Sequence, residues 1–121
     1  MPMISVSGLG SVSEEQVSQL RREVVLQTSE QLDCPLDWVR VFFPADRLEN
    51  PAHESEGSGL VYIQMNTSLL ADKPDADEQA KAITQKVAQT VWDSFSGERE
   101  VEMVISPLNP KWMQFLEAAP K

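Results

Sequence analysis

The sequence Trp38-Val39-Arg40-Val41-Phe42-Phe43 decides how this chain folds. All of its residues except Arg40 are apolar, so a strand here has apolar residues on both alternating sides. This pattern is typical of a sheet that is covered on both faces. We therefore predict a strand over residues 38–43 that holds one cation in apolar surroundings.

A helix is predicted directly before this strand, from residue 14 to about Leu32. Ser13 and Gln16 form a capping box, in which the Ser13 hydroxyl accepts the backbone N–H of Gln16 and the Gln16 side chain reaches back. Pro35 ends the helix. The inner stripe of the helix, at helical spacing, consists of Val17, Leu20, Val24 and Thr28.

A short strand over residues 2–6 precedes this helix, so the first unit has the order strand, helix, strand. The same order occurs a second time in the chain. The second unit has a strand, a helix and a strand at about residues 60–65, 75–95 and 101–106. Leu20 and Ile83 stand 63 residues apart, and the same offset places Arg40 on Met103. It also relates Val24 to Val87, Leu32 to Phe95, Val41 to Val104 and Pro44 to Pro107.

These patterns predict a single domain over residues 1–121 with an α/β (α+β) fold. Two βαβ repeats form a four-stranded mixed sheet, with both helices on one face. The predicted boundaries are about 1–44 for the first repeat, 45–59 for a loop, about 60–106 for the second repeat and 107–121 for a tail.

The sheet face without helices is expected to meet another subunit, because the strands are apolar on both sides. An alternative is a ferredoxin-like regulatory domain, which also places two helices on a four-stranded sheet. The order of the strands separates the two. A ferredoxin-like sheet interleaves the strands of the two units, whereas the first arrangement keeps the strands of each unit adjacent.

The composition of the chain limits the classes of partner and the kinds of site that we expect. The formal net charge of −9 and the pI of about 4.5 argue against nucleic acid and anionic membranes as partners. Cys34 is the one cysteine and His53 the one histidine, so neither an internal disulfide nor a histidine-rich metal site is expected. Without a membrane-length apolar run or a signal-peptide pattern, we expect a soluble cytoplasmic protein that needs no cofactor.

The beginning of the chain, Met1-Pro2, offers unusual chemistry. Removal of Met1 would give Pro2 a free secondary amine that its ring holds rigidly at the start of a strand. Desolvation and a nearby cation lower the pKa of such an amine toward neutrality, which suits a general base. The simpler interpretation is structural, since proline is tolerated at the first residue of a strand.

Four segments in register resemble the tautomerase superfamily, which includes 4-oxalocrotonate tautomerase and macrophage migration inhibitory factor. They are Met1-Pro2 with its strand, Ser13-Glu14-Glu15-Gln16, Leu32-Asp33-Cys34-Pro35-Leu36 and Val39-Arg40-Val41. The doubled unit and the exit Phe43-Pro44-Ala45-Asp46 resemble the migration-inhibitory-factor branch. The whole chain most resembles a bacterial subfamily of tautomerase-like proteins whose function is unassigned.

This resemblance implies a homotrimer with a site at the mouth of each Pro2 pocket, near a subunit boundary. It implies an isomerase, a keto–enol tautomerase of a small 2-keto acid, with Pro2 as the catalytic base. Arg40 would bind the substrate carboxylate or polarise its carbonyl, and the guanidinium fork suits a carboxylate. The alternative for Arg40 is an ion pair with an acid of the loop over residues 46–56.

The chain departs from the family at two cationic positions. Val12 stands where the small enzyme has a second arginine, and Cys34 stands where the migration-inhibitory-factor branch has a lysine. The resemblance therefore implies a monoacid or an uncharged carbonyl compound rather than a dicarboxylate. A neighbouring subunit could still supply a second cation from Arg47, Lys73 or Lys111.

The remaining candidates also have structural interpretations. His53 is either a solvated loop residue or a substrate-binding lid residue, and Cys34 is read as a small apolar filler. Trp112, Phe115 and Leu116 are interpreted as core or subunit packing. The alternative to catalysis is a non-catalytic oligomer of the same fold that binds a small metabolite or a protein partner.

Overall fold

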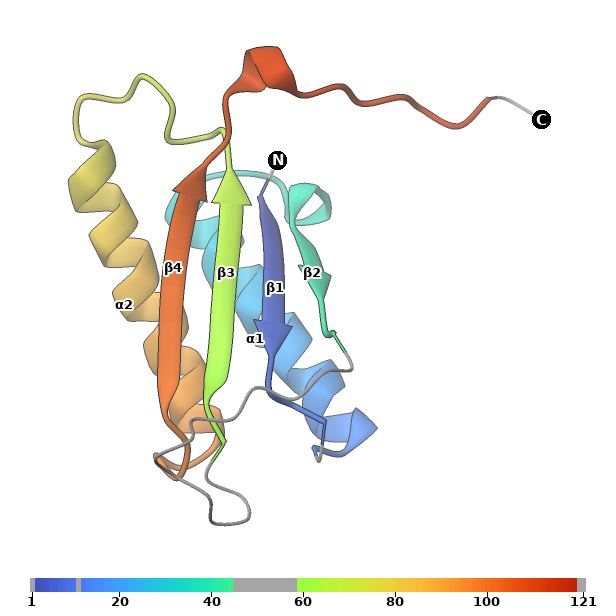
Figure 1. Cartoon of the computed structure of the whole chain (residues 1–121), viewed down its shortest axis with the longest axis vertical. Helices are drawn as coiled ribbons and strands as arrows, with labels where there is room; N and C mark the ends of the chain where they lie inside the picture. The colour runs from blue at the N-terminus through green and yellow to red at the C-terminus, as the bar shows by residue number, and fades with distance from the viewer. Residues whose placement is uncertain (1, 11, 45–58, 120–121) are drawn as a thin grey trace.

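The structure is a computed structural model that describes residues 2–10, 12–44 and 59–119. Its elements are β1 (Met3–Ser7), α1 (Glu14–Leu32), η1 (Leu36–Trp38), β2 (Arg40–Phe42), β3 (Val61–Thr67), α2 (Ala76–Ser94), β4 (Val101–Pro107) and η2 (Pro110–Trp112), where η1 and η2 are short 3-10 helices. Both α-helices lie against one face of the sheet (Figure 1). In the described ranges, neither helix combines the length and the hydropathy that a bilayer crossing requires.

The strand order is β2-β1-β3-β4. β1 runs parallel to β2, β3 runs parallel to β4, and the central pair β1 and β3 is antiparallel. The strands of each βαβ unit are therefore adjacent, which confirms the predicted mixed sheet with two helices on one face. The ferredoxin-like alternative is wrong, because its units would interleave.

The helix α1 begins and ends close to the predicted bounds. The Ser13 hydroxyl accepts the N–H of Gln16 at 3.2 Å, but the Gln16 side chain does not complete the capping box. Its Nε2 instead donates to the Ser94 carbonyl at 3.4 Å, an acceptor left over at the end of α2. The helix ends at Leu32, and its C-cap Asp33, two residues before Pro35, has a φ of 51° in the left-handed region.

The core lies between the sheet and the helices. Apolar side chains at helical spacing on α1 and α2 face alternate residues of the central strands, as amphipathic helices and strands require. The largest side chains that are completely buried are Ile4, Leu20, Ile63, Met65 and Ile83. This layer fixes β1 firmly, because the strand contributes two fully buried residues to it.

Positions 63 residues apart have matching burial in the two helices but not in the strands. The buried positions Leu20 and Val24 of α1 correspond to Ile83 and Val87 of α2. In the strands, Met103 packs against the core beneath the helices, whereas Arg40 is exposed. A shift of one residue moves a side chain to the other face of a sheet. Arg40 therefore has no structural counterpart in Met103.

The strand predicted over residues 38–43 is shorter than expected, because β2 covers Arg40–Phe42 and Trp38 belongs to η1. The Trp38 N–H donates to the Pro35 carbonyl at 3.1 Å, so the chain forms a 3-10 turn before the strand begins. β2 is an edge strand, and Phe42 is half exposed. The expectation of a strand covered on both faces is therefore wrong within one chain.

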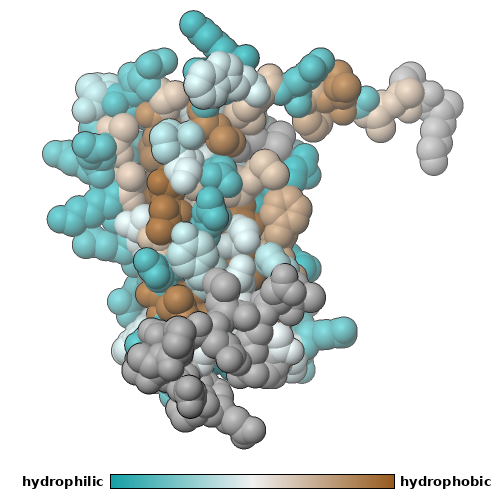
Figure 2. Space-filling view, viewed as in Figure 1, coloured by the Kyte–Doolittle hydropathy of each residue, from teal (hydrophilic) through white to brown (hydrophobic). Residues whose placement is uncertain are grey.

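The face of the sheet away from the helices mixes polar and apolar residues. Met3 lies between Arg40 and Asn66 across the strands. Met3, Phe42 and Val104 are exposed large apolar residues of this face. Figure 2 shows apolar residues scattered among polar ones on this side of the molecule. We refer to it below as the open face.

The tail after β4 leaves the body of the molecule (Figure 1). Trp112 lies in η2, and the residues that follow it, 113–119, belong to no helix or strand. Trp112 is 86% exposed, Phe115 66% and Leu116 77%. The interpretation of these residues as core is therefore wrong within one chain, and the interpretation as subunit packing stays a prediction.

Candidate active site

Pro2 lies at the entry to the central strand β1 and is buried. Ile4 and Val6, which follow it, are completely buried beneath the helices and anchor the strand. The Pro2 carbonyl accepts the N–H of Arg40 at 3.0 Å, which ties the start of β1 to the start of β2. At this first position the missing N–H of proline costs the sheet no hydrogen bond.

Arg40 is close to Pro2 along the backbone, but its side chain lies on the open face. It pairs with Met3, and both residues are exposed. Within residues 2–10, 12–44 and 59–119, the Arg40 guanidinium has neither a hydrogen bond nor an ion pair. An exposed cation keeps its water, so the apolar surroundings predicted for Arg40 from the sequence require a neighbour that covers this face. The acids of the loop over residues 46–56 lie outside the described residues.

A hollow of about 340 Å³ adjoins the start of β1. Its lining is mainly apolar and contains no charged side chain among the described residues: Met3, Ser68, Pro110, Met113, Gln114 and Phe115. Met3 follows Pro2 directly and pairs with Arg40 in the sheet, but neither of these two predicted site residues lines the hollow. Such a lining suits an apolar group of a small molecule whose polar end reaches the chain start.

The sequence did not identify the tail as part of this hollow. Met113 and Phe115 stand two residues apart in an extended segment, so their side chains fall on one side of it. That alternation is visible in the sequence. The path of the tail over β1 could not be predicted from the sequence, because it depends on the direction that the chain takes after η2.

The other predicted site residues are not gathered here. Lys73 and Lys111 are exposed and do not line the hollow at Met3. Lys111 lines a separate hollow of about 640 Å³, between the tail and Asp72. His53 and Arg47 lie outside the described residues, so their predicted roles stay predictions.

Cys34 has no feature of a reactive thiol. It is buried after the end of α1, and burial raises the pKa of its thiol above the ordinary value of 9.0; the positive charge of the chain's amino group opposes this rise, and Asp33 adds to it. A thiol that stays protonated is a weak nucleophile and a weak metal ligand. Among the residues whose positions are described, no three His, Cys, Asp or Glu side chains cluster closely enough to bind a metal.

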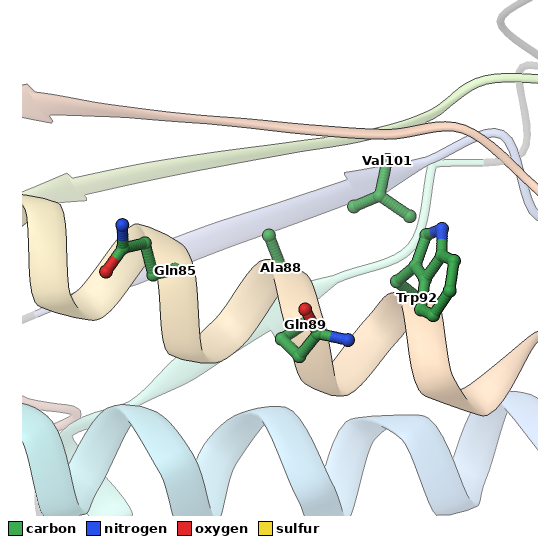
Figure 3. Close-up of a pocket in the computed structure, with 5 residues that line it drawn as sticks. All are labelled: Gln85, Ala88, Gln89, Trp92 and Val101. Carbon is green, nitrogen blue, oxygen red and sulfur yellow. The ribbon is translucent and has the colours of Figure 1, made fainter. Parts of the chain in front are cut away.

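Two further hollows lie away from Pro2. One of about 390 Å³ is lined from both helices by Glu23, Leu26, Gln27, Thr90, Asp93 and Ser94. Another of about 490 Å³ runs between α2 and β4 and is lined by Gln85, Ala88, Gln89, Trp92 and Val101 (Figure 3). Neither contains a residue of the predicted site.

Comparison with known proteins supports the fold. No protein-family model matches the chain, and no curated protein matches it. A wild-type fused 4-OT, an asymmetric trimer, has a TM-score of 0.65 at 16% identity, over 87% of this chain and 86% of that chain. A domain of unknown function (DUF1904) from Sebaldella termitidis has a TM-score of 0.61 at 20% identity, over 95% of both chains.

A macrophage migration inhibitory factor-like protein from Entamoeba histolytica is similar over a comparable length. Its TM-score is 0.63 at 9% identity, over 97% of this chain and 95% of that chain. This chain therefore has the fold of 4-OT and of migration inhibitory factor-like proteins, as the four sequence segments implied. At these identities the likeness establishes the fold and leaves the chemistry to be argued from the residues.

Proposed function

We propose that this chain is a keto–enol tautomerase of a small 2-keto acid, with the Pro2 amine as its general base. The observation that carries the proposal is the place of Pro2, which is buried at the entry to the central strand of a tautomerase-like fold. The apolar hollow beside Met3 supports it. The chemistry requires a mature chain that begins at Pro2, because a proline nitrogen in an amide is not a base.

In this proposal the Pro2 nitrogen moves a proton between oxygen and carbon. In the ketonising direction it accepts the proton of the enol hydroxyl, and the resulting ammonium returns a proton to the carbon beside the carbonyl. The amine is thus regenerated and the substrate keeps its number of protons. Burial disfavours the ammonium form, which keeps the amine available as a base near neutral pH.

The charge of the site selects the proposed substrate class. Arg40 offers a planar fork that binds one carboxylate through two hydrogen bonds. The hollow at Met3 supplies no second cation from the described residues, and its lining is mainly apolar. The proposed substrate is therefore a monocarboxylate whose other end is apolar. His53 is proposed as a lid residue over this site.

We propose that the protein works as a homotrimer. Arg40 lies on the open face with exposed Met3 and Phe42, and a copy that covers this face would remove water from the guanidinium. Loss of water strengthens the attraction between a cation and a carboxylate. The trimeric state of the fused 4-OT supports this assembly by analogy of fold alone.

The amine can be tested with a 2-keto acid that carries an alkyne conjugated to its ketone. The Pro2 nitrogen would add to the distal alkyne carbon while a proton goes to the neighbouring carbon, so the adduct gains the full mass of the reagent. We expect one equivalent of reagent on the peptide that begins at Pro2. Intact and peptide mass spectrometry measure the extent and the site.

The matched control is a chain extended by two residues ahead of Pro2, in which the nitrogen is an amide. This control should not be labelled at Pro2, and Arg40→Gln should need a higher reagent concentration for half-maximal labelling. Labelling that falls mainly on Cys34 or on lysines in the native chain would contradict the proposal.

The second candidate is a non-catalytic oligomer that binds a small carboxylate or a protein partner. The exposed Arg40, which has no partner within the described residues, favours it. This candidate predicts that a monocarboxylate raises the melting temperature of the protein while the alkyne reagent leaves Pro2 unmodified. The two candidates therefore give opposite results in the same labelling experiment.

A further inference from the structure

The register of the sheet places four side chains in one row across the open face. Met3 pairs with Arg40 of β2 on one side and with Asn66 of β3 on the other. Asn66 pairs in turn with Ser106 of β4. Neighbouring strands lie about 4.8 Å apart, so the Cα atoms of Arg40 and Asn66 are about 10 Å apart. This row is the one nearest to Pro2, because Met3 is the first residue of β1.

The backbone of Asn66 is held firmly, whereas its side-chain amide has no partner. Met65 and Thr67, the residues before and after it, are completely buried beneath the helices, so the Asn66 side chain lies on the open face. The Thr67 carbonyl accepts the Leu108 N–H at 2.8 Å, which fixes this end of β3 to the chain after β4. Asn66 itself is half-buried, and its amide makes no hydrogen bond within the part of the chain that the structure describes.

The unpaired amide of Asn66 is accessible to a ligand. Among the described residues, Gln27 and Thr28 are those with a fully buried side-chain oxygen that lacks a hydrogen bond, and both belong to α1. The amide of Asn66 is therefore open to solvent, and water or a ligand can complete its hydrogen bonds. A carboxamide offers both a donor and an acceptor, so it can bind a ketone oxygen as well as an enol hydroxyl.

The hollow at Met3 adjoins this row. Met3 and Ser68 both line it, and Ser68 follows Asn66 by two residues along the chain. The apolar stem of an arginine packs on an apolar neighbour such as Met3, which brings the Arg40 guanidinium toward Asn66. An aliphatic 2-keto acid with its apolar end in the hollow therefore has its carboxylate and ketone above Met3, between a guanidinium and an amide.

We propose that Asn66 is a specificity-determining residue that binds the ketone oxygen of the substrate while Arg40 binds the carboxylate. This inference rests on the proposed function for the class of ligand. In a 2-keto acid the two groups are on adjacent carbons, so one hydrogen-bonding side chain on each side of Met3 recognises both at once. The Asn66 amide donates to the ketone and accepts from the hydroxyl of the enol. A monocarboxylate without the ketone leaves this amide to water and binds more weakly.

Two ligands that differ only in the ketone, 2-oxopentanoate and pentanoate, test the proposal. Chemical-shift titrations of the ¹⁵N-labelled protein measure the dissociation constant of each. We expect Asn66→Leu to raise the dissociation constant of 2-oxopentanoate about five- to tenfold, because one hydrogen bond is lost. The same variant should leave the dissociation constant of pentanoate unchanged, whereas Arg40→Gln should weaken both ligands by similar factors.

The matched control is Gln64→Leu, which replaces an amide on the same strand and the same face, one row further from Pro2. It should change neither dissociation constant by more than about twofold. Equal weakening of both ligands by Asn66→Leu, or none, would overturn the proposal. So would an unmodified protein that binds 2-oxopentanoate no more tightly than pentanoate. The titrations do not depend on proton transfer, so a Pro2 amine that neither labels nor catalyses would contradict the proposed function without deciding this result.

Discussion

Gly8 is the residue whose replacement should disturb the site most from outside it. Its φ is +97°, and an added Cβ would lie 2.2 Å from the Leu60 carbonyl oxygen. Its own carbonyl accepts a hydrogen bond from Arg99 at 3.1 Å. The absence of a side chain at Gly8 therefore lets the chain after β1 pass close to the residue that precedes β3. The placement of Pro2 at the other end of β1 depends on the same strand.

We predict that Gly8→Ala lowers the free energy of unfolding by more than about 1 kcal/mol, because the backbone conformation and the space both exclude a side chain. Gly10→Ala, at an exposed position two residues later, should change it by less than about 0.5 kcal/mol. Urea unfolding at one protein concentration measures both. Equal effects of the two substitutions would contradict this account of the turn.

At the same scale, the sequence identified Pro2 and Arg40 as candidates but misjudged the surroundings of Arg40. The apolar neighbours Val39 and Val41 suggested a half-buried guanidinium, yet the alternation of β2 places Arg40 on the open face. The residue types along a strand do not indicate which face of the sheet another subunit will cover. The backbone hydrogen bond from Arg40 to Pro2 became visible only once β1 and β2 were paired.

At the scale of elements, the two helices begin with different chemistry. Ser13 accepts a capping hydrogen bond from the backbone of α1. Asp75, at the start of α2, makes no capping hydrogen bond, and its Oδ2 instead accepts from the Gln79 side chain at 2.8 Å. The two helices therefore depend on their first residues to different degrees.

We expect Ser13→Ala to destabilise the fold by about 1 kcal/mol, since it removes a partner of an otherwise unpaired backbone N–H. Asp75→Ala should cost less than about 0.5 kcal/mol, because an exposed side-chain pair contributes little. Denaturant midpoints at a fixed protein concentration compare the two variants. A larger cost for Asp75→Ala would show that the capping geometry is assigned to the wrong helix.

The helices were predictable because cap, periodicity and breaker agree with one another. Leu20 and Val24 recur in Ile83 and Val87, and both sets are buried as the repeat required. The strand β2 was less predictable, because three residues give little periodicity and Trp38 extends the apolar pattern without belonging to the strand. The side of the sheet that Arg40 occupies followed from pairing, which no local pattern encodes.

At the scale of the whole molecule, the mixed four-stranded sheet and the placement of both helices followed from the two repeats. The course of the tail did not, because Trp112, Phe115 and Leu116 look like core residues in any local reading of the sequence. Their exposure, and the hollow that the tail forms over Met3, belong to the complete chain.

The most direct test of the central claim joins two readings on one sample of untagged protein. Its intact mass shows whether the mature chain begins at Pro2, and the same sample is assayed for ketonisation of phenylenolpyruvate beside Pro2→Ala. We predict a mass without Met1 and a rate that falls by about 10²- to 10⁴-fold in the variant, the usual contribution of a general base. Retention of Met1 in an active protein, or equal rates for the two proteins, would contradict the assignment of Pro2 as the base.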